Sequence, residues 1–152
     1  MDINLRKIDR SNYQECIDLK VAQSQVRYVA PNMFSLVQAA YEPDMCPLGV
    51  YNKGKMIGFI LYDFDRDLNG WSMSRFMIDE KYQNSGFGKR ALEVFLDYFK
   101  ENHKSDEIYT SAETDNNVAI SLYENFGFKN IGKFEYESGG NKYVEYRMLL
   151  RF

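Results

Sequence analysis

Two stretches of this sequence combine residue types that could bind an anion and move a proton. The first is the glycine-rich run Gln83-Asn84-Ser85-Gly86-Phe87-Gly88-Lys89. The second runs from Asn116 to Phe128 and reads Asn-Asn-Val-Ala-Ile-Ser-Leu-Tyr-Glu-Asn-Phe-Gly-Phe, with Tyr123 at its centre. Backbone amides and a phenol hydroxyl are both hydrogen-bond donors. Whether the two segments can act together depends on the elements that position them.

The glycine-rich run stands between an apolar stretch and an amphipathic one, so we expect it to open a helix. Glycines let the backbone turn sharply and approach a ligand closely. The first amides of a helix have no partner inside it, so their N–H groups converge on an anion such as a pyrophosphate. The run lacks the Lys-Ser/Thr ending of a P-loop and the third glycine of a Rossmann turn, and taken alone it also fits a plain turn.

Hydrophobic periodicity predicts the elements around these segments. Alternation at 3–8 predicts a strand, and the apolar spacing at 13–26 and 33–41 predicts two helices. Strands follow at 48–64, in two halves joined by a turn at 52–55, and at 71–79. The remaining prediction is a helix at 88–102, a strand at 107–112, a helix at 117–126 that ends at Gly127, and two strands at 129–137 and 142–150 joined by a turn at 138–141.

The order of these elements is strand, two helices, three strands, helix, strand, helix and two strands. The strand-helix-strand unit in the middle requires a parallel pair, whereas the hairpins are antiparallel. The pattern therefore predicts a mixed sheet with helices on both faces, and the length of 152 residues predicts a single domain spanning 1–152.

Composition excludes several classes of function. The 19 basic and 22 acidic residues give a net charge of −3 without a basic tract, so we expect no nucleic acid and a mild preference for cationic partners. No apolar run approaches the ~18 residues of a membrane span. The start MDINLRKIDR has no apolar signal core, and Cys16 and Cys46 lack metal-ligand spacing, so we expect a cytoplasmic protein without a metal.

Histidine and aromatic content set two further expectations. His103 is the only histidine and stands in the polar stretch KENHKSDE, so we expect it to be exposed and to form neither a metal site nor a Ser-His-Asp triad. The 12 Tyr, 11 Phe and 1 Trp are an unusually high aromatic content. They could form an apolar groove or interface, or fill a small core.

The two chemical segments together resemble the acyl-CoA-binding core of the GNAT (GCN5-related) N-acetyltransferase family. That family has a strand, then Gln/Arg-x-x-Gly-x-Gly/Ala opening a helix, then a strand and Asn-x-x-Ala-x-x-Leu-Tyr-x-x-x-Gly-Phe. The resemblance covers essentially the whole chain, although the first 45 residues match only in arrangement. It implies a mixed, mostly antiparallel α/β sheet of about seven strands, with about four helices on both faces.

The resemblance also implies a set of residues that bind acetyl-CoA as co-substrate. Backbone amides from Ser85 to Lys89, which include Gly86, Phe87 and Gly88, would hold the pyrophosphate, with Gln83 and Asn84 at the lip. The edge formed by Phe76, Met77 and Ile78 would pair with pantetheine like an added strand, which requires a splayed neighbouring strand. Asn116 would bind the pantetheine arm, and Tyr123 would stand beside the sulfur.

Tyr123 has a physical case as the general acid of such a reaction. Aminolysis of a thioester expels a thiolate whose conjugate acid titrates near ~8.5, and a phenol with a pKa near ~10 is still protonated at neutral pH. The alternative is a core aromatic that packs on its helix neighbours. An attacking amine with a pKa near ~10.4 must lose a proton first, and Glu113 is the nearest candidate base or amine contact, unless it is simply a solvated acid of its turn.

Within the family the chain looks most like the bacterial spermine/spermidine (diamine) acetyltransferases. A polyamine needs acids spaced along a groove, which Glu42, Asp44, Asp63, Asp65, Asp67 and Glu113 could supply, although any acidic protein displays such residues. Polyamine-acetylating relatives often carry an acidic residue on the strand before the cofactor edge. This chain has Ser74 and Arg75 there, and Arg75 would repel a cation if it faced the cleft.

Three alternatives stay open at this point. The acceptor could be another amine, such as an aminoglycoside, an amino acid or a protein N-terminus. The chain could also be a non-catalytic acetyl-CoA-binding module, or an interaction domain that uses its aromatic surface. A homodimer is a further expectation, with the strand at 142–150 pairing across the interface.

Overall fold

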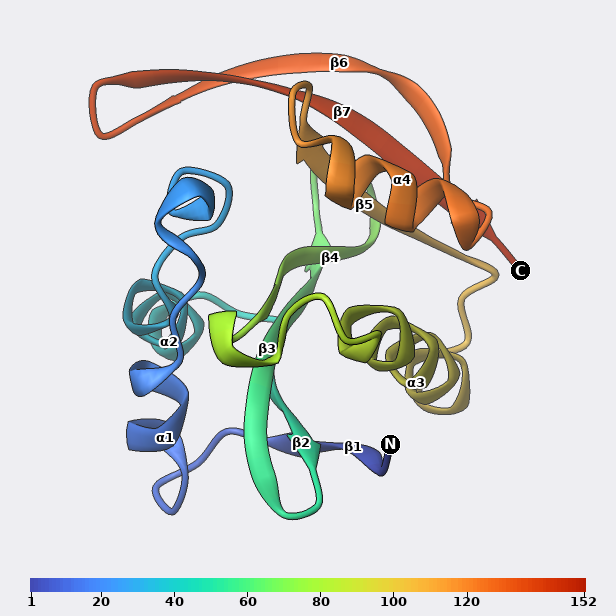
Figure 1. The fold of residues 1–152 in the computed structure, drawn as a ribbon. Helices are drawn as coiled ribbons and strands as arrows, with labels where there is room; N and C mark the ends of the chain where they lie inside the picture. Colours follow the sequence, from blue (N-terminus) through green and yellow to red (C-terminus); the bar gives the residue numbers. More distant parts are fainter.

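The computed structural model describes all residues from 1 to 152 and contains one seven-stranded sheet in the order β1-β2-β3-β4-β5-β7-β6 (Figure 1). The strands are β1 (Ile3–Lys7), β2 (Met45–Asn52), β3 (Lys55–Asp65), β4 (Gly70–Ile78), β5 (Glu107–Glu113), β6 (Lys129–Ser138) and β7 (Asn141–Arg151). The helices are α1 (Tyr13–Asp18), α2 (Asn32–Tyr41), α3 (Phe87–Asn102) and α4 (Asn117–Asn125), with 3-10 turns η1 (Gln23–Gln25) and η2 (Glu80–Tyr82).

The centre of the sheet is its weakest junction. Neighbouring strands are antiparallel except β4 and β5, which are parallel and share only two paired positions, Ser72 with Tyr109 and Met73 with Thr110. On the other side of β4, Leu61 is paired with Arg75 and Tyr62 with Met73, so Ser74 is an extra residue. Such a bulge bends its strand and ends regular pairing. Beyond Met73 the two strands therefore separate and leave a split in the sheet.

Two hydrophobic cores lie on opposite faces of the sheet. The larger core joins one face to α3, which contributes its buried stripe, and to Tyr123 of α4. The smaller core joins the other face to α1 and α2. Figure 1 shows the same arrangement, with α1 and α2 on one side of β3 and β4 and with α3 on the other. The predicted mixed sheet with helices on both faces is confirmed.

The predicted helix at 13–26 is wrong in its second half. Helix α1 ends at Asp18, and Leu19 is already extended. The backbone of Lys20 is held by tertiary bonds, because its N–H donates to Asp79 Oδ2 at 3.0 Å and its carbonyl accepts from Glu80 N–H at 2.7 Å. These bonds favour extended backbone over a continued helix, and only the short turn η1 follows.

His103 is not the exposed residue that its polar neighbours predict. It follows the last residue of α3 and packs against Trp71, with ring centroids 4.1 Å apart. Its Nε2 is 3.0 Å from the Tyr62 hydroxyl, and burial lowers its pKa. The partner is a tyrosine in an aromatic cluster, so the ring serves packing.

The strand expected to pair across a dimer has no free edge. β7 is paired with β5 on one side and with β6 on the other, so β6 is the edge strand. The predicted route of dimerisation through 142–150 does not fit this arrangement. No helix in the structure is long and apolar enough to span a membrane.

Candidate active site

The loop before α3 is shaped as an anion cradle. Asn84 and Gly86 both adopt positive φ, 60° and 84°, which turns the chain sharply into the helix. The first amide with an intrahelical acceptor here is that of Arg90, which donates to Gly86 O at 3.1 Å. A Cβ at Gly88 would meet only the Ile78 side chain, at 3.8 Å. The first amides of α3 thus have no intrahelical acceptor and carry the positive end of the helix dipole.

The Gln83 side chain fixes this loop in place. Its Nε2 donates to Ile78 O and to Gln25 Oε1, each at 2.8 Å. Both of its N–H donors are therefore used within the chain. Gln83 therefore fixes the shape of the loop and links it to Ile78 and to η1.

The edge of β4 beside the cradle is open toward β5. Phe76, Met77 and Ile78 are paired with β3 on one side, whereas the pairing with β5 ends at Met73. The free edge has the form that an extended, amide-containing ligand can join as an added strand. The splayed neighbour that the sequence required is present, and it is produced by the bulge at Ser74.

Tyr123 lies at the point where β4 and β5 part. The Asn116 side chain caps α4 by accepting from Ala119 N–H at 3.3 Å, which sets the helix that carries Tyr123. Tyr123 is only 6% exposed and packs on Phe128. Burial raises its pKa to about 12, with Thr110 acting in the opposite direction. The hydroxyl therefore remains protonated at neutral pH.

Two carboxylates lie on the opposite face of the sheet from Tyr123. Glu113 of β5 is register partner to Glu145 of β7, and Ser111 Oγ donates to Glu145 Oε1 at 2.9 Å. The Glu113 side chain is 11% exposed, and its Oε2 is buried without a hydrogen-bond partner. Burial raises the pKa of Glu113, whereas the positive charge of Arg27 lowers it.

An aromatic surface of β6 and β7 continues from these carboxylates. Tyr136 stacks on Tyr143 with ring centroids 5.1 Å apart, and burial raises the pKa of Tyr136, as does the neighbouring Glu145. Aromatic faces and carboxylates both attract cations. Glu145 and Tyr136 were missed by the sequence interpretation, because only the register of β5, β7 and β6 brings them to Glu113.

Arg75 lies on this same face, but it is tied to α2. Its Nη1 donates to Gln38 Oε1 at 2.8 Å, and its guanidinium stands 5.6 Å from the Phe34 ring. Burial lowers its pKa, and the negative charge of Asp63 opposes that shift. The Asp63 carboxylate in turn accepts from Ser74 Oγ. The positive charge of Arg75, which the sequence indicated as a possible source of repulsion for a cation, is therefore partly neutralised by Asp63.

The six predicted groove acids do not act alike. Asp65 Oδ1 accepts from Asp67 N–H at 2.9 Å and so shapes the β3–β4 turn. Asp44 pairs with Arg66 at 3.7 Å, and Glu42 directly follows the last residue of α2. Glu113 lies on β5 beyond its last position paired with β4, whereas Asp63 accepts from Ser74 and faces the charge of Arg75. The structure contains no group of three or more His, Cys, Asp or Glu that could hold a metal ion.

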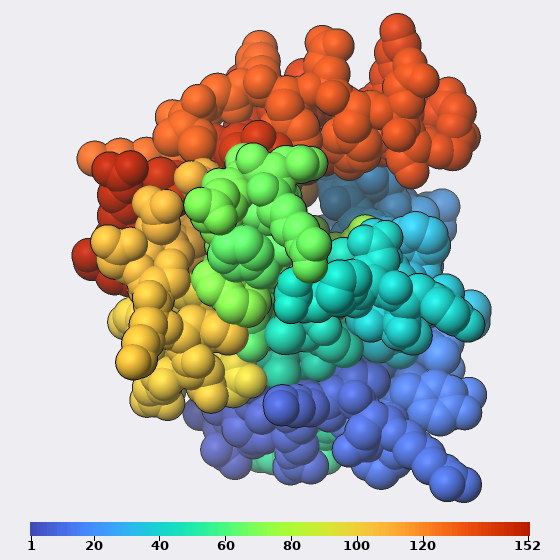
Figure 2. Space-filling view, turned by 180° about the vertical axis from the view of Figure 1, so that it is seen from behind, coloured from blue at the N-terminus to red at the C-terminus, as the bar shows by residue number.

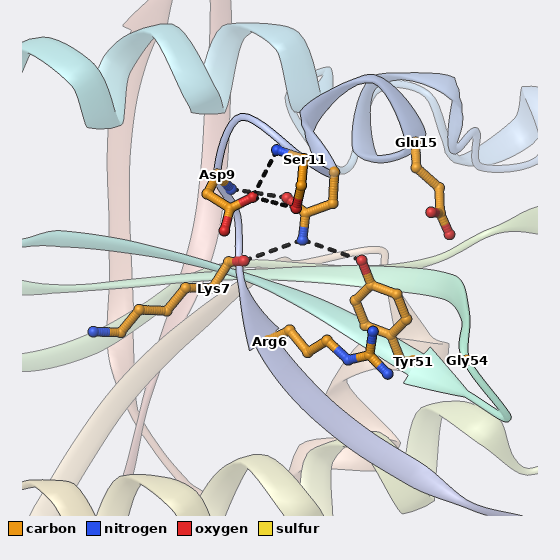
Figure 3. Close-up of a pocket in the computed structure, with 8 residues that line it drawn as sticks. Arg6, Lys7, Asp9, Ser11, Glu15, Tyr51 and Gly54 are labelled. Atoms are coloured by element: carbon orange, nitrogen blue, oxygen red, sulfur yellow. Dashed lines mark hydrogen bonds between the residues drawn. The ribbon is translucent and has the colours of Figure 1, made fainter.

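A separate polar hollow of about 360 Å³ lies near the start of α1 and is shown in Figure 3. Its polar groups satisfy one another: Asp9 Oδ1 accepts from Ser11, and Asn12 Nδ2 donates to Lys7 O and to the Tyr51 hydroxyl, both at 3.1 Å. The network closes the turn between β1 and α1. It stands apart from the split and brings no proton-transfer group to it.

The cradle, the open β4 edge and Tyr123 agree with a match of residues 12–128 to the model of the Acetyltransferase (GNAT) family. This chain belongs to the GNAT family. A Bacillus subtilis protein described as spermine/spermidine N(1)-acetyltransferase is 34% identical over 143 residues, which cover 90% of this chain and 93% of that protein. This GNAT chain is accordingly an acetyltransferase, and the Bacillus subtilis relative is described as transferring to nitrogen.

More distant relatives share parts or only the fold. The N-alpha-acetyltransferase RimI of Mycobacterium tuberculosis is 32% identical over 70 residues, covering 44% of this chain and 42% of that protein. Spermidine N-acetyltransferase of Vibrio cholerae, solved with CoA and spermine, superposes with a TM-score of 0.77 at 19% identity, covering 99% of this GNAT chain and 95% of that one. The latter likeness shows the shared fold.

Proposed function

We propose that residues 1–152 form one cytoplasmic acetyltransferase domain that moves the acetyl group of acetyl-CoA directly to a primary amine of a polyamine such as spermidine or spermine. The observation that carries the proposal is the split between β4 and β5, which has a buried phenol on one face and two carboxylates on the other. The identity of 34% to a spermine/spermidine acetyltransferase across 90% of the chain supports the polyamine acceptor.

Acetyl-CoA fits the face of the sheet that carries α3 and α4. The pyrophosphate would accept hydrogen bonds from the amides of Ser85 to Lys89, at the N-terminus of the 16-residue helix α3. The amides of the pantetheine arm would pair along Phe76 to Ile78, and Asn116 retains its Nδ2 donors for the same arm. This path leads the thioester to the split beside Tyr123.

Starting from the ammonium form of the acceptor, transfer requires two protons to leave the nitrogen and one to reach the sulfur. The neutral amine nitrogen attacks the acetyl carbonyl carbon from the carboxylate face, which is the face of the sheet that carries Glu113 and Glu145. A C–N bond forms as the C–S bond breaks. Tyr123 donates its proton to the departing thiolate, and the nitrogen, which becomes positively charged on attack, gives up its second proton, which restores the Tyr123 hydroxyl and leaves a neutral amide. Glu113, directly or through a water, accepts the ammonium proton before attack. The products are the acetylated amine and free CoA, and the whole step takes place in a ternary complex.

The acceptor face suits a compound with several positive charges. Glu113, Glu145 and the stacked Tyr136 and Tyr143 offer two carboxylates and two aromatic faces to a chain of ammonium groups. Figure 2 shows a hollow between the β6–β7 hairpin and the segments of α2 and the β3–β4 turn, where such a chain could lie. This placement explains how the chain can accept a polyamine although it contains Arg75. The net charge of −3 also favours a cationic acceptor.

The proposal is tested by measuring CoA release from acetyl-CoA against a panel of amines. The panel contains spermine, spermidine, putrescine, an aminoglycoside, amino acids and a peptide with a free N-terminus. We expect the highest kcat/KM for spermidine or spermine. A higher kcat/KM for the peptide or the aminoglycoside would overturn the polyamine assignment, and binding of acetyl-CoA without turnover on any amine would overturn the enzymatic one.

Glu113→Gln should lower kcat/KM for spermidine by at least about tenfold at neutral pH, because it removes both a charge and a proton acceptor. Burial raises the pKa of the Glu113 carboxyl above its ordinary 4.5. As the pH falls through that raised pKa, the wild type loses its carboxylate, whereas the glutamine variant has none to lose. The ratio of the two kcat/KM values should therefore fall toward one as the pH is lowered.

Using the ratio cancels the ionisation of the amine itself, which affects both proteins equally. Glu137→Gln, an exposed position on β6, serves as the charge-matched control and should keep the wild-type profile. A ratio that stays constant with pH would show that Glu113 does not act through its carboxylate.

A further inference from the structure

The segment between α1 and α2 reaches both sides of the split. It is fixed at its first end by the bonds of Lys20 and at its far end by Asn32, whose Nδ2 donates to Cys16 O at 2.9 Å. Between these anchors, Gln25 accepts from Gln83 of the anion cradle. Two residues later, Arg27 reaches the carboxylate face.

Arg27 occupies the negative end of the proposed acceptor site. Its Nη2 is 2.5 Å from Asp115 Oδ2 and 3.7 Å from Glu113 Oε1. The Arg27 side chain is 59% exposed, whereas that of Glu113 is 11% exposed. A solvent-exposed guanidinium therefore neutralises a buried carboxylate that has one oxygen without a partner. This is the charge and the location that an incoming ammonium group needs.

We propose that Arg27 is an internal competitor of the acceptor, which holds the place of a substrate ammonium beside Glu113 and leaves it when the polyamine binds. The inference rests on the proposed function and adds a residue that sets acceptor specificity. The exchange costs little free energy, because the shorter ion pair, with Asp115, is exposed on both sides and such pairs are weak, and because an ammonium group replaces Arg27 beside Glu113.

The exchange also selects for the number of charges on the acceptor. When Arg27 leaves, Glu113 and Asp115 both lose their positive partner. A diamine or polyamine can neutralise both carboxylates, whereas a monoamine of similar length leaves one unpaired. Glu113 is 11% exposed and Asp115 is 56% exposed, and the two negative charges together attract a doubly charged acceptor more strongly than a singly charged one. The arrangement therefore favours diamines and polyamines over monoamines.

The test compares wild type with Arg27→Gln and Arg27→Lys. In Arg27→Gln we expect the KM for spermidine to fall about two- to fivefold, the range expected from loss of one exposed ion pair, while kcat and the KM for acetyl-CoA stay constant. Arg27→Lys keeps the charge and should stay close to wild type. Arg151→Gln is the matched control, since Arg151 pairs with Glu107 at the other end of β5 and should change neither KM.

Several outcomes decide the inference separately from the proposed function. An unchanged or raised KM for spermidine in Arg27→Gln would overturn the competitor role, even if the wild type acetylates polyamines. Calorimetric titration with spermidine, which needs no turnover, should show tighter binding to Arg27→Gln than to wild type. Tighter binding without turnover would support the competitor and contradict the proposed reaction, and absence of binding to both proteins would overturn both.

Discussion

Tyr123→Phe is expected to lower kcat by about 10²- to 10⁴-fold, the usual contribution of general acid catalysis, while leaving acetyl-CoA binding intact. Tyr123 is the only residue of α4 that is buried, and it stands where β4 and β5 separate. Its pKa of about 12 keeps the proton in place across the neutral range. Removal of the hydroxyl leaves the thiolate to depart without a donor.

The measurement combines CoA release with calorimetric titration of acetyl-CoA. The dissociation constant should stay within about twofold, because the phenylalanine ring keeps the packing on Phe128 and only the hydroxyl is lost. Tyr98→Phe, a half-buried position on α3, is the matched control and should retain full turnover. An unchanged rate of CoA release in Tyr123→Phe would contradict the assignment of Tyr123 as the general acid.

Gly88→Asp is the second change for which we expect a large effect, namely a rise of at least about tenfold in the dissociation constant of acetyl-CoA, or ~1.4 kcal/mol. Gly88 lies in the first turn of α3, where its amide would face the pyrophosphate. A carboxylate there repels the phosphates and competes for the same N–H donors. The same carboxylate interacts favourably with the helix dipole, by about 0.3–1 kcal/mol, so the free energy of unfolding should not fall.

The variant Gly88→Ala shows whether the effect of Gly88→Asp comes from the charge of the new side chain or from its size. A Cβ at this position makes only an ordinary contact, 3.8 Å from the Ile78 side chain, and alanine favours helix over glycine. The alanine variant should bind acetyl-CoA much as the wild type does. Equal affinity of the aspartate variant and the wild type would show that the pyrophosphate does not lie at the start of α3.

Much of the fold was predictable because it depends on local signals. The turn at 52–55 needs positive φ, and Lys53 and Gly54 supply it. The stripe of apolar residues on α3 is buried as its helical spacing predicts. Local signals failed at 19–26, where the tertiary hydrogen bonds of Lys20 outweigh the helical pattern. They failed also at His103, where Trp71, an aromatic partner distant in sequence, partly covers a residue in a polar stretch.

The candidate site was likewise predictable where it depends on local sequence and not where it depends on tertiary contacts. The anion cradle is contiguous in sequence, so its glycines and helix start could be seen directly. The carboxylate face is not contiguous, because Glu113, Glu145 and Tyr136 come from three strands and meet only through their register. Arg27 is further still from this face in sequence, and nothing in its local surroundings indicates that it would reach Glu113.

The most direct test of direct acetyl transfer to a polyamine is a quantitative product analysis of the wild-type reaction. Acetyl-CoA and spermidine are incubated with the enzyme, and both products are measured by mass spectrometry while initial rates are recorded at varied concentrations of each substrate. We predict acetylspermidine and free CoA in equal amounts, with intersecting double-reciprocal lines that indicate a ternary complex. Free CoA without acetylspermidine, or parallel lines that indicate an acetylated enzyme, would contradict the account.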